Sequence, residues 1–272
     1  MNPLCVVTGT SSGIGGRLAE ALLESGRDVV GIARRESALT HSNYQHVQLD
    51  LSDVDAMETF FQGAFLEMSS LPARPSVALI NNAALLPPVG NQNSIPAGEL
   101  ARAFLVNSAA PIWLMGFFND LCREVPLHII NISSGAAFRG VPGWTAYCST
   151  KAALRMAGMV FEVDQQSFPE YKGRKGKITM INYSPGTVAT DMQAQIRGYT
   201  PSEFPLHERF VGFHEKGELK SIDQPVEEIL MMLQRDDLKP YNELYYGDIR
   251  KMNTPETPPE NAPAQPASGE KG

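Results

Sequence analysis

A tyrosine and a lysine four residues apart could share proton chemistry in this chain. Tyr147 and Lys151 lie in a segment with helical spacing, so their side chains fall on the same helix face. Thirteen residues before Tyr147, a strand-like run ends in Ser133-Ser134. In an open α/β sheet, ligands bind beyond the carboxyl ends of the strands, where a serine and a tyrosine can converge on one substrate oxygen. We take Ser134 as the predicted serine and Ser133 as its alternative.

The spacing of tyrosine and lysine is weak evidence by itself, because Tyr171 and Lys175 show it as well. That second pair lies in a polar connection, and no serine precedes it at the end of a strand. We interpret it as a coincidence on the surface, which makes it an internal control for the first pair.

A glycine-rich turn near the N-terminus predicts a phosphate site. The run TGTSSGIG follows an apolar strand and precedes a helical pattern. Glycine lets the backbone approach a pyrophosphate closely, and the helix N-terminus offers free N–H groups and a positive dipole end. The residues expected at the phosphates are Gly9, Ser11, Ser12, Gly13, Ile14 and Gly15. An ordinary glycine-rich turn is the alternative interpretation.

The residues that follow the second and third strand-like segments predict the nucleotide. Arg34 follows the second segment, where an arginine accommodates the 2′-phosphate of NADP and an acid would bind the ribose hydroxyl of NAD. Asp50 and Leu51 follow the third, where a carboxylate could accept the adenine amino group. We therefore expect NADPH or NADP+ as the cofactor. A solvated surface pair, Arg34-Arg35, is the alternative.

Strand-like and helical patterns alternate along the chain. The expected strands cover Leu4–Thr8, Asp28–Ala33, Tyr44–Leu49, Val77–Ile80, Leu127–Ile132, Lys177–Tyr183 and Glu243–Tyr246. Helical spacing marks Ile14–Leu23, Val54–Met68, Leu100–Leu121, Ala146–Phe168 and Val226–Gln234. The alternation predicts an α/β fold, a single-domain, Rossmann-type, doubly wound parallel sheet with helices on both faces. We expect this domain over residues 1–250, with a lid at 193–221 and a disordered, Pro-rich tail at 253–272.

Composition argues against several other classes of protein. The formal net charge is −7 and no long basic run occurs, which argues against a nucleic-acid partner. No apolar stretch of roughly 18 residues is expected to span a membrane, and the N-terminus carries no secretory signal. Three widely spaced cysteines fit neither a disulfide framework nor a zinc site. We therefore expect a cytoplasmic protein that binds no metal.

Several motifs together resemble those of the short-chain dehydrogenase/reductase family, along about residues 4 to 250. They are TGTSSGIG, Asn81-Asn82-Ala83-Ala84, Asn107, Ser134, Tyr147 with Lys151, and Ser184-Pro185-Gly186-Thr187. The family's N-N-A-G motif ends here in alanine, a mild departure that affects local backbone freedom. The resemblance implies an oxidoreductase that uses a nicotinamide dinucleotide.

The resemblance also implies a role for each motif. Tyr147 would give a proton to the alkoxide that hydride attack on a carbonyl creates, and Ser134 would orient the substrate oxygen. Lys151 would hold the nicotinamide ribose and lower the pKa of the tyrosine from about 10 by about three units, or roughly 4 kcal/mol. Asn107 would hold a water that relays protons to Lys151, with a helix cap as the alternative. Further cofactor contacts implied by the family are Asn82, Ala83, Pro185, Gly186, Val188 and Thr190.

Three segments resemble the sepiapterin reductase-like branch of the family, especially its microbial benzil reductases: Gly143–Cys148, Asn182–Gly186 with Thr190–Gln193, and Gly217–Ser221. The resemblance implies NADPH-dependent reduction of a vicinal dicarbonyl or a side-chain carbonyl. Sepiapterin reductases hold the pterin with an aspartate near the C-terminus, and alignment places Tyr245 at that position. A shift of this short alignment by a few residues would instead place an acid there, Glu243 or Asp248. We therefore expect a benzil-like α-diketone as substrate, with a pterin as the alternative. The expected substrate pocket contains Ser134, Trp144, Tyr147, Met192 and Tyr245.

Other function classes are weaker. A reductase of carrier-protein-bound ketones would favour a basic docking patch, which the sequence lacks. A nucleotide-sensing regulator without catalysis would have lost Tyr147 or Lys151. The expected partners are therefore a small-molecule carbonyl compound and a second copy of the chain. A homodimer is expected because Asn107–Leu121 and Ala146–Phe168 carry more apolar surface than one sheet face covers, and the family resemblance implies pairing across a two-fold axis.

Overall fold

The computed structural model describes residues 1–252, in which parallel strands form a central sheet. The strands are β1 (Leu4–Thr8), β2 (Asp28–Ala33), β3 (Tyr44–Gln48), β4 (Val77–Asn81), β5 (Leu127–Ile132), β6 (Ile178–Ser184) and β7 (Tyr241–Tyr245). Their order across the sheet is β3-β2-β1-β4-β5-β6-β7, and every neighbouring pair is parallel. The strand order reverses between β1 and β4, which is where sheets of this kind bind ligands. The predicted doubly wound α/β fold is confirmed.

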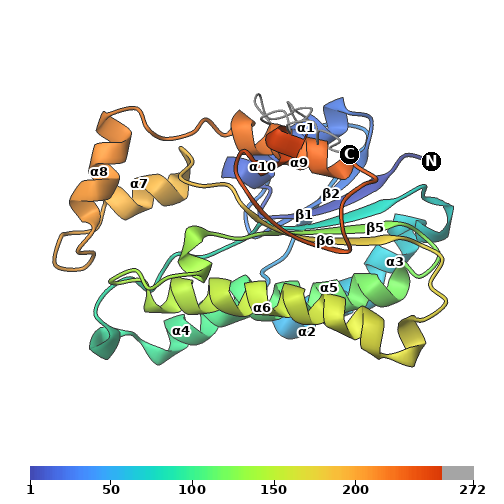
Figure 1. The fold of residues 1–272 in the computed structure, drawn as a ribbon, viewed down its shortest axis with the longest axis horizontal. Coiled ribbons are helices and arrows are strands. Elements are labelled where there is room, and N and C mark those ends of the chain that lie inside the picture. The colour runs from blue at the N-terminus through green and yellow to red at the C-terminus, as the bar shows by residue number, and fades with distance from the viewer. Residues whose placement is uncertain (253–272) are drawn as a thin grey trace, which may run out of the picture.

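Helices cover both faces of the sheet (Figure 1). The upper layer in that view holds α1 (Gly13–Glu24), α9 (Asp223–Leu233) and α10 (Asp248–Met252). The lower layer holds α2 (Val54–Gln62), α4 (Ala97–Phe104), α5 (Ala110–Leu121) and α6 (Thr145–Ser167). The short helix α3 (Ala64–Ser69) follows α2. Two further helices, α7 (Asp191–Arg197) and α8 (His207–Glu215), follow β6 and lie at the left end of the molecule.

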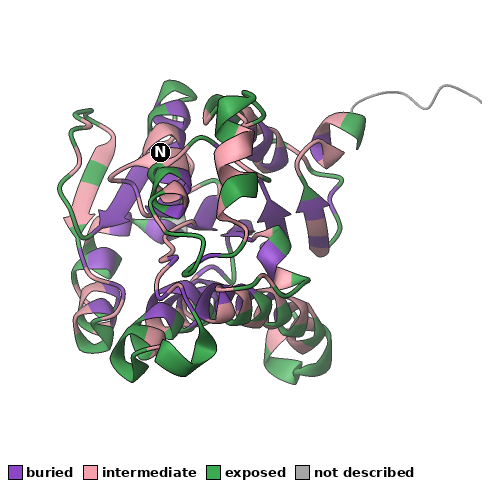
Figure 2. Cartoon of the chain, turned by 90° about the vertical axis from the view of Figure 1, so that its left-hand side faces the viewer, coloured by how far each residue is buried: buried purple, intermediate pink, exposed green. Residues whose placement is uncertain are grey.

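Two apolar clusters enclose the sheet, one on each face. Val6, Leu79 and Ile129 belong to one cluster, while Val7 and Ile80 belong to the other. Successive strand side chains point to opposite faces, so a strand covered on both sides is apolar at successive positions. Figure 2 shows the central strands buried between two helix layers whose outer surfaces are exposed. The edge strand β3 has no fully buried residue, in agreement with its place at the margin of the sheet.

Two helices of the lower layer differ in detail from the sequence prediction. The helix expected over Val54–Met68 is divided into α2 and α3 at Gly63, which caps the end of one and the start of the other. The helix expected over Leu100–Leu121 begins at Ala97 and contains a π-helical segment, Leu105–Ala109. Pro111 follows that segment and has no N–H to donate to the preceding turn, which accounts for the irregular hydrogen bonding there.

The helical run Ala97–Leu121 is long and apolar enough to cross a membrane by length and composition. The sequence prediction that no segment reaches this length is therefore corrected. Leu114 and Phe118 of this run are fully buried and belong to the apolar cluster beneath the sheet. In the structure the run is a helix of the core, packed against β4 and β5. The predicted disordered tail, 253–272, lies outside the described residues.

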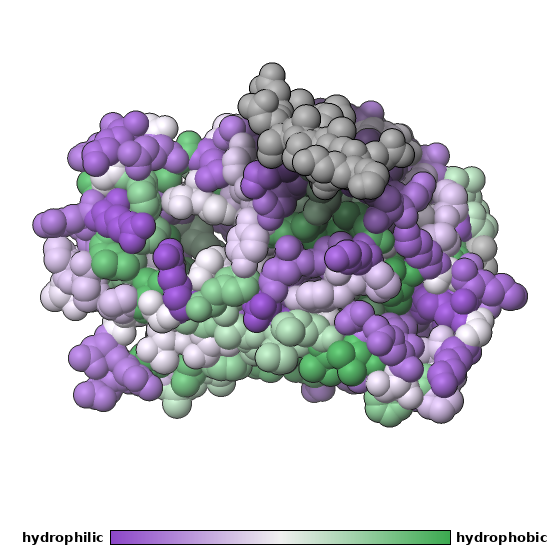
Figure 3. All heavy atoms as spheres, viewed as in Figure 1, coloured by the Kyte–Doolittle hydropathy of each residue, from purple (hydrophilic) through white to green (hydrophobic). Residues whose placement is uncertain are grey.

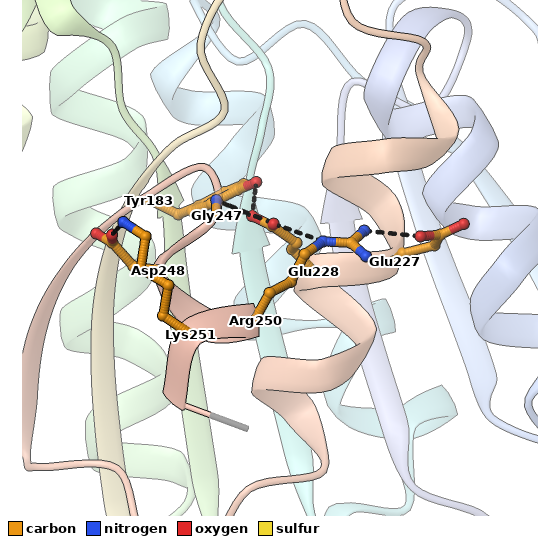
Figure 4. A network of polar contacts seen from close by, with 7 residues as sticks. All are labelled: Tyr183, Glu227, Glu228, Gly247, Asp248, Arg250 and Lys251. Carbon is orange, nitrogen blue, oxygen red and sulfur yellow. Dashed lines mark hydrogen bonds and ion pairs between the residues drawn. The ribbon is translucent and has the colours of Figure 1, made fainter. Parts of the chain in front are cut away.

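A buried carboxylate holds the C-terminal segment against the sheet. Glu228 of α9 is 0% exposed and accepts hydrogen bonds from the Tyr183 hydroxyl at 2.7 Å, the Gly247 N–H at 3.0 Å and the Arg250 Nε at 3.0 Å (Figure 4). Arg250 also pairs with Glu227 at 2.7 Å. A buried charge is tolerated only where donors surround it. Because Tyr183 belongs to β6, these bonds tie α9 and the chain after β7 to a central strand.

Candidate active site

A cleft of about 1130 Å³ opens beyond the carboxyl ends of the strands, at the end of the molecule that carries α7 and α8. Nineteen of the residues predicted from the sequence line it: Gly9, Ser11, Ser12, Gly13, Ile14, Arg34, Asp50, Leu51, Asn82, Ala83, Ser134, Trp144, Tyr147, Lys151, Pro185, Gly186, Val188, Thr190 and Met192. Three predicted residues, Gly15, Asn107 and Tyr245, do not line the cleft. On the surface over α7 and α8, hydrophilic residues border a hollow with hydrophobic residues beside it (Figure 3).

The turn between β1 and α1 allows a ligand to approach the backbone closely. Gly9 and Gly13 have φ angles of +79° and +60°, which side-chain-bearing residues rarely adopt. A Cβ atom on Gly9 would lie 2.8 Å from Nδ2 of Asn82, and one on Gly15 would lie 2.3 Å from the Gly9 carbonyl oxygen. Gly15 therefore acts in packing and not as a lining residue. Ser12, the N-cap of α1, makes no side-chain capping bond, so the first N–H groups of the helix suit a phosphate.

Two adjacent arginines follow β2 at the same end of the cleft. Arg34 and Arg35 both line it. Arg35 reaches over the glycine-rich turn, with its Nη2 atom 3.3 Å from Oγ of Ser11 and 3.1 Å from Oγ of Ser12. The sequence prediction named Arg34 alone, because the direction of a side chain that follows a strand depends on what lies beside it in the fold. A doublet of guanidinium groups beside the turn fits a ribose phosphate.

Asp50 follows β3 and also lines the cleft. Its Oδ1 accepts hydrogen bonds from the N–H and the hydroxyl of Ser52, at 2.9 and 2.7 Å, and its Oδ2 accepts one from Arg102 at 2.8 Å. Partial burial would raise the pKa of Asp50, but the bonds from Ser52 and the guanidinium of Arg102 hold it below its usual value. An oriented, ionised carboxylate therefore faces the place expected for adenine. Arg102 was not predicted, since it comes from α4, 52 residues away.

Tyr147 and Lys151 lie one turn apart on the inner face of α6 and are 7% and 2% exposed. The Lys151 Nζ donates a 2.7 Å hydrogen bond to the carbonyl of Ile132 and lies 5.8 Å from the centre of the Tyr147 ring. Ser134 follows β5, and its Oγ accepts a hydrogen bond from the Ala136 N–H at 3.2 Å. Helix α6 and strand β5 thus bring the three predicted side chains to one part of the cleft.

Burial controls the protonation of this pair. Burial raises the pKa of Tyr147 to about 12, although hydrogen bonding with Ser134 opposes the rise. Burial lowers the pKa of Lys151 to about 8. The expectation that Lys151 brings the tyrosine pKa toward neutrality is not met by the residues of the chain alone, because removal from water outweighs the other contributions. At neutral pH Tyr147 is therefore a phenol and Lys151 is mostly an ammonium, which suits a donor of protons.

Ser133, the alternative serine, is placed differently. It is 5% exposed, lines the cleft, and its Oγ has no hydrogen-bond partner in the described part of the chain. Hydrogen bonding with Tyr147 is made by Ser134. The geometry thus favours Ser134 as the serine that shares a ligand with the tyrosine.

Asn107 is buried and joins two segments of the chain through its side-chain hydrogen bonds. It is 0% exposed, lies in the π-helical segment and does not line the cleft. Its Oδ1 accepts a bond from the Leu85 N–H at 2.7 Å, and its Nδ2 donates to the Leu85 carbonyl at 2.8 Å and to the Thr150 hydroxyl at 3.1 Å. Its side chain is therefore occupied and neither caps a helix nor contacts the cleft. It holds the chain after β4 against α6, beside Lys151.

Tyr245 lies outside the cleft, contrary to the sequence prediction. It is 44% exposed and its ring packs 5.6 Å from that of Phe138. The neighbouring acids are also directed elsewhere: Glu243 accepts a two-pronged bond from Arg155, and Asp248 accepts from the Tyr245 N–H. Strand β7 is the edge of the sheet, so its end lies apart from the switch point between β1 and β4. No carboxylate from this segment lines the cleft.

The remaining wall of the cleft is aromatic and apolar. Trp144 stacks on Phe204 with ring centres 5.0 Å apart, and it meets the edge of Tyr147 at 5.5 Å. Phe204 is 0% exposed and packs against the tryptophan without lining the cleft. Phe210 and Phe213 of α8 also line the cleft. Helices α7 and α8 are thus packed against Trp144, the residue that precedes α6 and its tyrosine.

Comparison with known proteins agrees with this geometry. A family model described as short chain dehydrogenase matches residues 4–199. A benzil reductase ((S)-benzoin forming) from Bacillus subtilis is 31% identical over 85% of this chain and 93% of its own length. A sepiapterin reductase from Rattus norvegicus is 27% identical over 90% of this chain and 97% of its own length. A crystal structure of a short chain dehydrogenase/reductase from Saccharomyces cerevisiae, 24% identical, superposes with a TM-score of 0.75 over 91% of this chain and 97% of that one. The chain therefore belongs to the short-chain dehydrogenase family of oxidoreductases.

Proposed function

We propose that this protein uses NADPH to reduce one carbonyl group of an aromatic vicinal dicarbonyl compound to a hydroxyketone. The observation that carries the proposal is the placement of Tyr147 beside Lys151 and Ser134 in a cleft whose other wall is aromatic. The relative from Bacillus subtilis is named a benzil reductase that forms (S)-benzoin, which supports the same substrate class.

The residues of the chain supply the proton for this reduction. NADPH, when bound, would supply the hydride, which leaves negative charge on the carbonyl oxygen. The O–H bond of Tyr147 breaks and its proton goes to that oxygen, which leaves a phenolate. Ser134 donates a hydrogen bond that orients the oxygen, and the Lys151 ammonium stabilises the phenolate through its opposite charge. The phenolate then recovers its proton from solvent.

The polar end of the cleft favours NADPH over NADH. Arg34 and Arg35 present two guanidinium groups where β2 ends, and Asp50, which lines the cleft after β3, is paired with Arg102. An acid directly after β2 would have bound the ribose hydroxyl of NAD. Two fixed positive charges instead suit the 2′-phosphate of NADPH.

The substrate end favours an aromatic dicarbonyl over a pterin. Trp144 and Phe210 give it flat apolar surface, and burial of rings there provides binding energy. Neither Glu243 nor Asp248 lines the cleft, so an acid from this segment does not anchor a pterin.

Steady-state kinetics test this function. We expect a higher kcat/KM for benzil than for sepiapterin, and a higher kcat/KM with NADPH than with NADH. Efficient turnover of sepiapterin with feeble reduction of benzil would favour the pterin alternative. Tight binding of NADPH without reduction of any carbonyl compound would favour the alternative of a regulator that senses the nucleotide.

A further inference from the structure

Two arginines on the substrate side of the cleft have no part in the reduction as proposed. Arg139 follows the short helical turn Gly135–Ala137 after β5, and Arg209 lies on α8. Both line the cleft. The guanidinium of Arg209 lies 5.4 Å from the ring centre of Phe213, another lining residue. Within residues 1–252, neither arginine makes a side-chain hydrogen bond or an ion pair.

Arg139 and Arg209 belong to the half of the chain's arginines that form no ion pair within residues 1–252. The sequence has 30 acidic residues against 23 Lys and Arg, so partners are not scarce. Other arginines use them: Arg17, Arg74, Arg102, Arg123, Arg155, Arg235 and Arg250 all form ion pairs. Glu208 and Glu215 share α8 with Arg209, yet neither lines the cleft.

The charged residues of the cleft divide into three groups. Arg34, Arg35 and the Asp50–Arg102 pair lie where the nucleotide is expected. Lys151 serves the proton donor. The residues left to face a substrate are Arg139 and Arg209, with Glu99 and Asp191 as the other acidic residues that line the cleft. Asp191 starts α7 directly after Thr190, beside the glycine-rich turn, where a second small pocket joins it to Gly13. The same cleft therefore carries the aromatic wall and two arginines that form no ion pair within residues 1–252.

We propose that Arg139 and Arg209 bind a carboxylate carried by the substrate, at the end remote from the carbonyl that is reduced. This inference rests on the proposed function and narrows its substrate class to an acid-bearing aromatic dicarbonyl. A guanidinium binds carboxylate oxygens in a two-pronged geometry, and fixed positive charge at the mouth of a cleft concentrates anions there. A neutral diketone fills the aromatic wall but leaves both guanidinium groups without a partner.

A pair of matched substrates tests the inference. Benzil and 4-carboxybenzil share the reacting dicarbonyl and differ by one carboxylate. With NADPH, we expect kcat/KM for 4-carboxybenzil to exceed that for benzil by about tenfold or more, since a charge-assisted contact is worth roughly tenfold to a hundredfold. Added NaCl should reduce this preference, because partly exposed charges are screened.

Variants assign the preference to the two arginines. Arg209→Gln and Arg139→Gln should each lower the ratio of the two kcat/KM values by about fivefold or more, and Arg209→Lys should restore part of it. Lys172→Gln removes the same charge from an exposed residue outside the cleft and should leave the ratio unchanged. Equal kcat/KM for the two substrates in the wild type, or an unchanged ratio in both arginine variants, would overturn the inference. Failure to reduce either compound would instead refute the proposed function.

Discussion

The side chain of Lys151 donates a 2.7 Å hydrogen bond to the main-chain carbonyl of Ile132, the last residue of β5. This bond joins α6 to the strand that leads into Ser134, and Tyr147 lies one turn before the lysine. The distance between the proton donor and the serine is thereby set by a central strand instead of a loop. The carbonyl orients the ammonium without neutralising it, so the positive charge stays available to a phenolate.

Replacement of Tyr147 by phenylalanine should abolish reduction while NADPH binding persists. The variant removes the acid and keeps the ring that packs against Trp144. We expect kcat to fall by about a hundredfold or more, the range for loss of a general acid, with cofactor affinity measured by fluorescence titration.

Tyr171→Phe is the matched control. Tyr171 lies in the turn Pro169–Tyr171, outside the cleft, and Lys175 of the same motif is an exposed partner of Glu124. Its kinetics should equal those of the wild type. Near-normal turnover in Tyr147→Phe would refute the assigned mechanism.

The pH dependence of kcat/KM should show loss of activity on the alkaline side. Burial lowers the pKa of Lys151 to about 8 and raises that of Tyr147 to about 12. Both groups are protonated at pH 7, and as pH rises Lys151 loses its proton first. The ammonium that stabilises the phenolate then disappears, so the rate of reduction should decline above about pH 8. A rate that stays level from pH 6.5 to pH 10 would contradict this.

Arg34→Ala should weaken NADPH binding much more than NADH binding. A charged contact with the 2′-phosphate is worth roughly tenfold to a hundredfold in affinity. Dissociation constants for both nucleotides provide the measurement, and NADH serves as the control because it lacks that phosphate. Arg35→Ala should affect both nucleotides, since Arg35 also holds Ser11 and Ser12 of the glycine-rich turn. Equal losses for the two nucleotides in Arg34→Ala would show that Arg34 does not select the cofactor.

A second copy of the chain is proposed to cover the outer face of α6. Met156, Val160 and Val163 are 53%, 47% and 55% exposed and recur at helical spacing, so they form one apolar stripe. Val160→Glu should therefore produce a monomer in light scattering at micromolar concentration. Leu66→Glu makes the same change at an exposed position of α3 and should leave the dimer intact. A wild-type protein that is already a monomer would refute the proposal.

Tyr183→Phe should lower thermal stability without altering the cleft. The variant removes a 2.7 Å bond to the buried Glu228 carboxylate and leaves that charge short of a donor. A hydrogen bond to a charged group contributes about 1.5–3 kcal/mol, which corresponds to a fall in Tm of roughly 3–12 °C for a domain of this size. Calorimetry measures the change, with Tyr171→Phe as control. An unchanged Tm would mean that Gly247 and Arg250 satisfy the carboxylate alone.

Local pattern was sufficient for the fold and for much of the site. Apolar strands in alternation with helices implied the parallel sheet, because each strand had to be covered on both faces. Helical periodicity put Tyr147 and Lys151 on one face, and the glycine-rich turn after the first strand indicated the phosphate site. These inferences depend on residues close together in the chain, where spacing determines direction.

Contacts between distant segments determined the features of the site that spacing in the sequence did not predict. The bonds of Asn107 to Leu85 and Thr150, and the pairing of Arg102 with Asp50, join residues from 22 to 52 positions apart. The place of Tyr245 depended on β7 being the outermost strand. The opposite pKa shifts of Tyr147 and Lys151 arise from burial, which a spacing pattern does not measure. Sequence periodicity fixes which side of an element a residue occupies, whereas its partners, its solvation and its charge state follow only from what the folded chain packs against it.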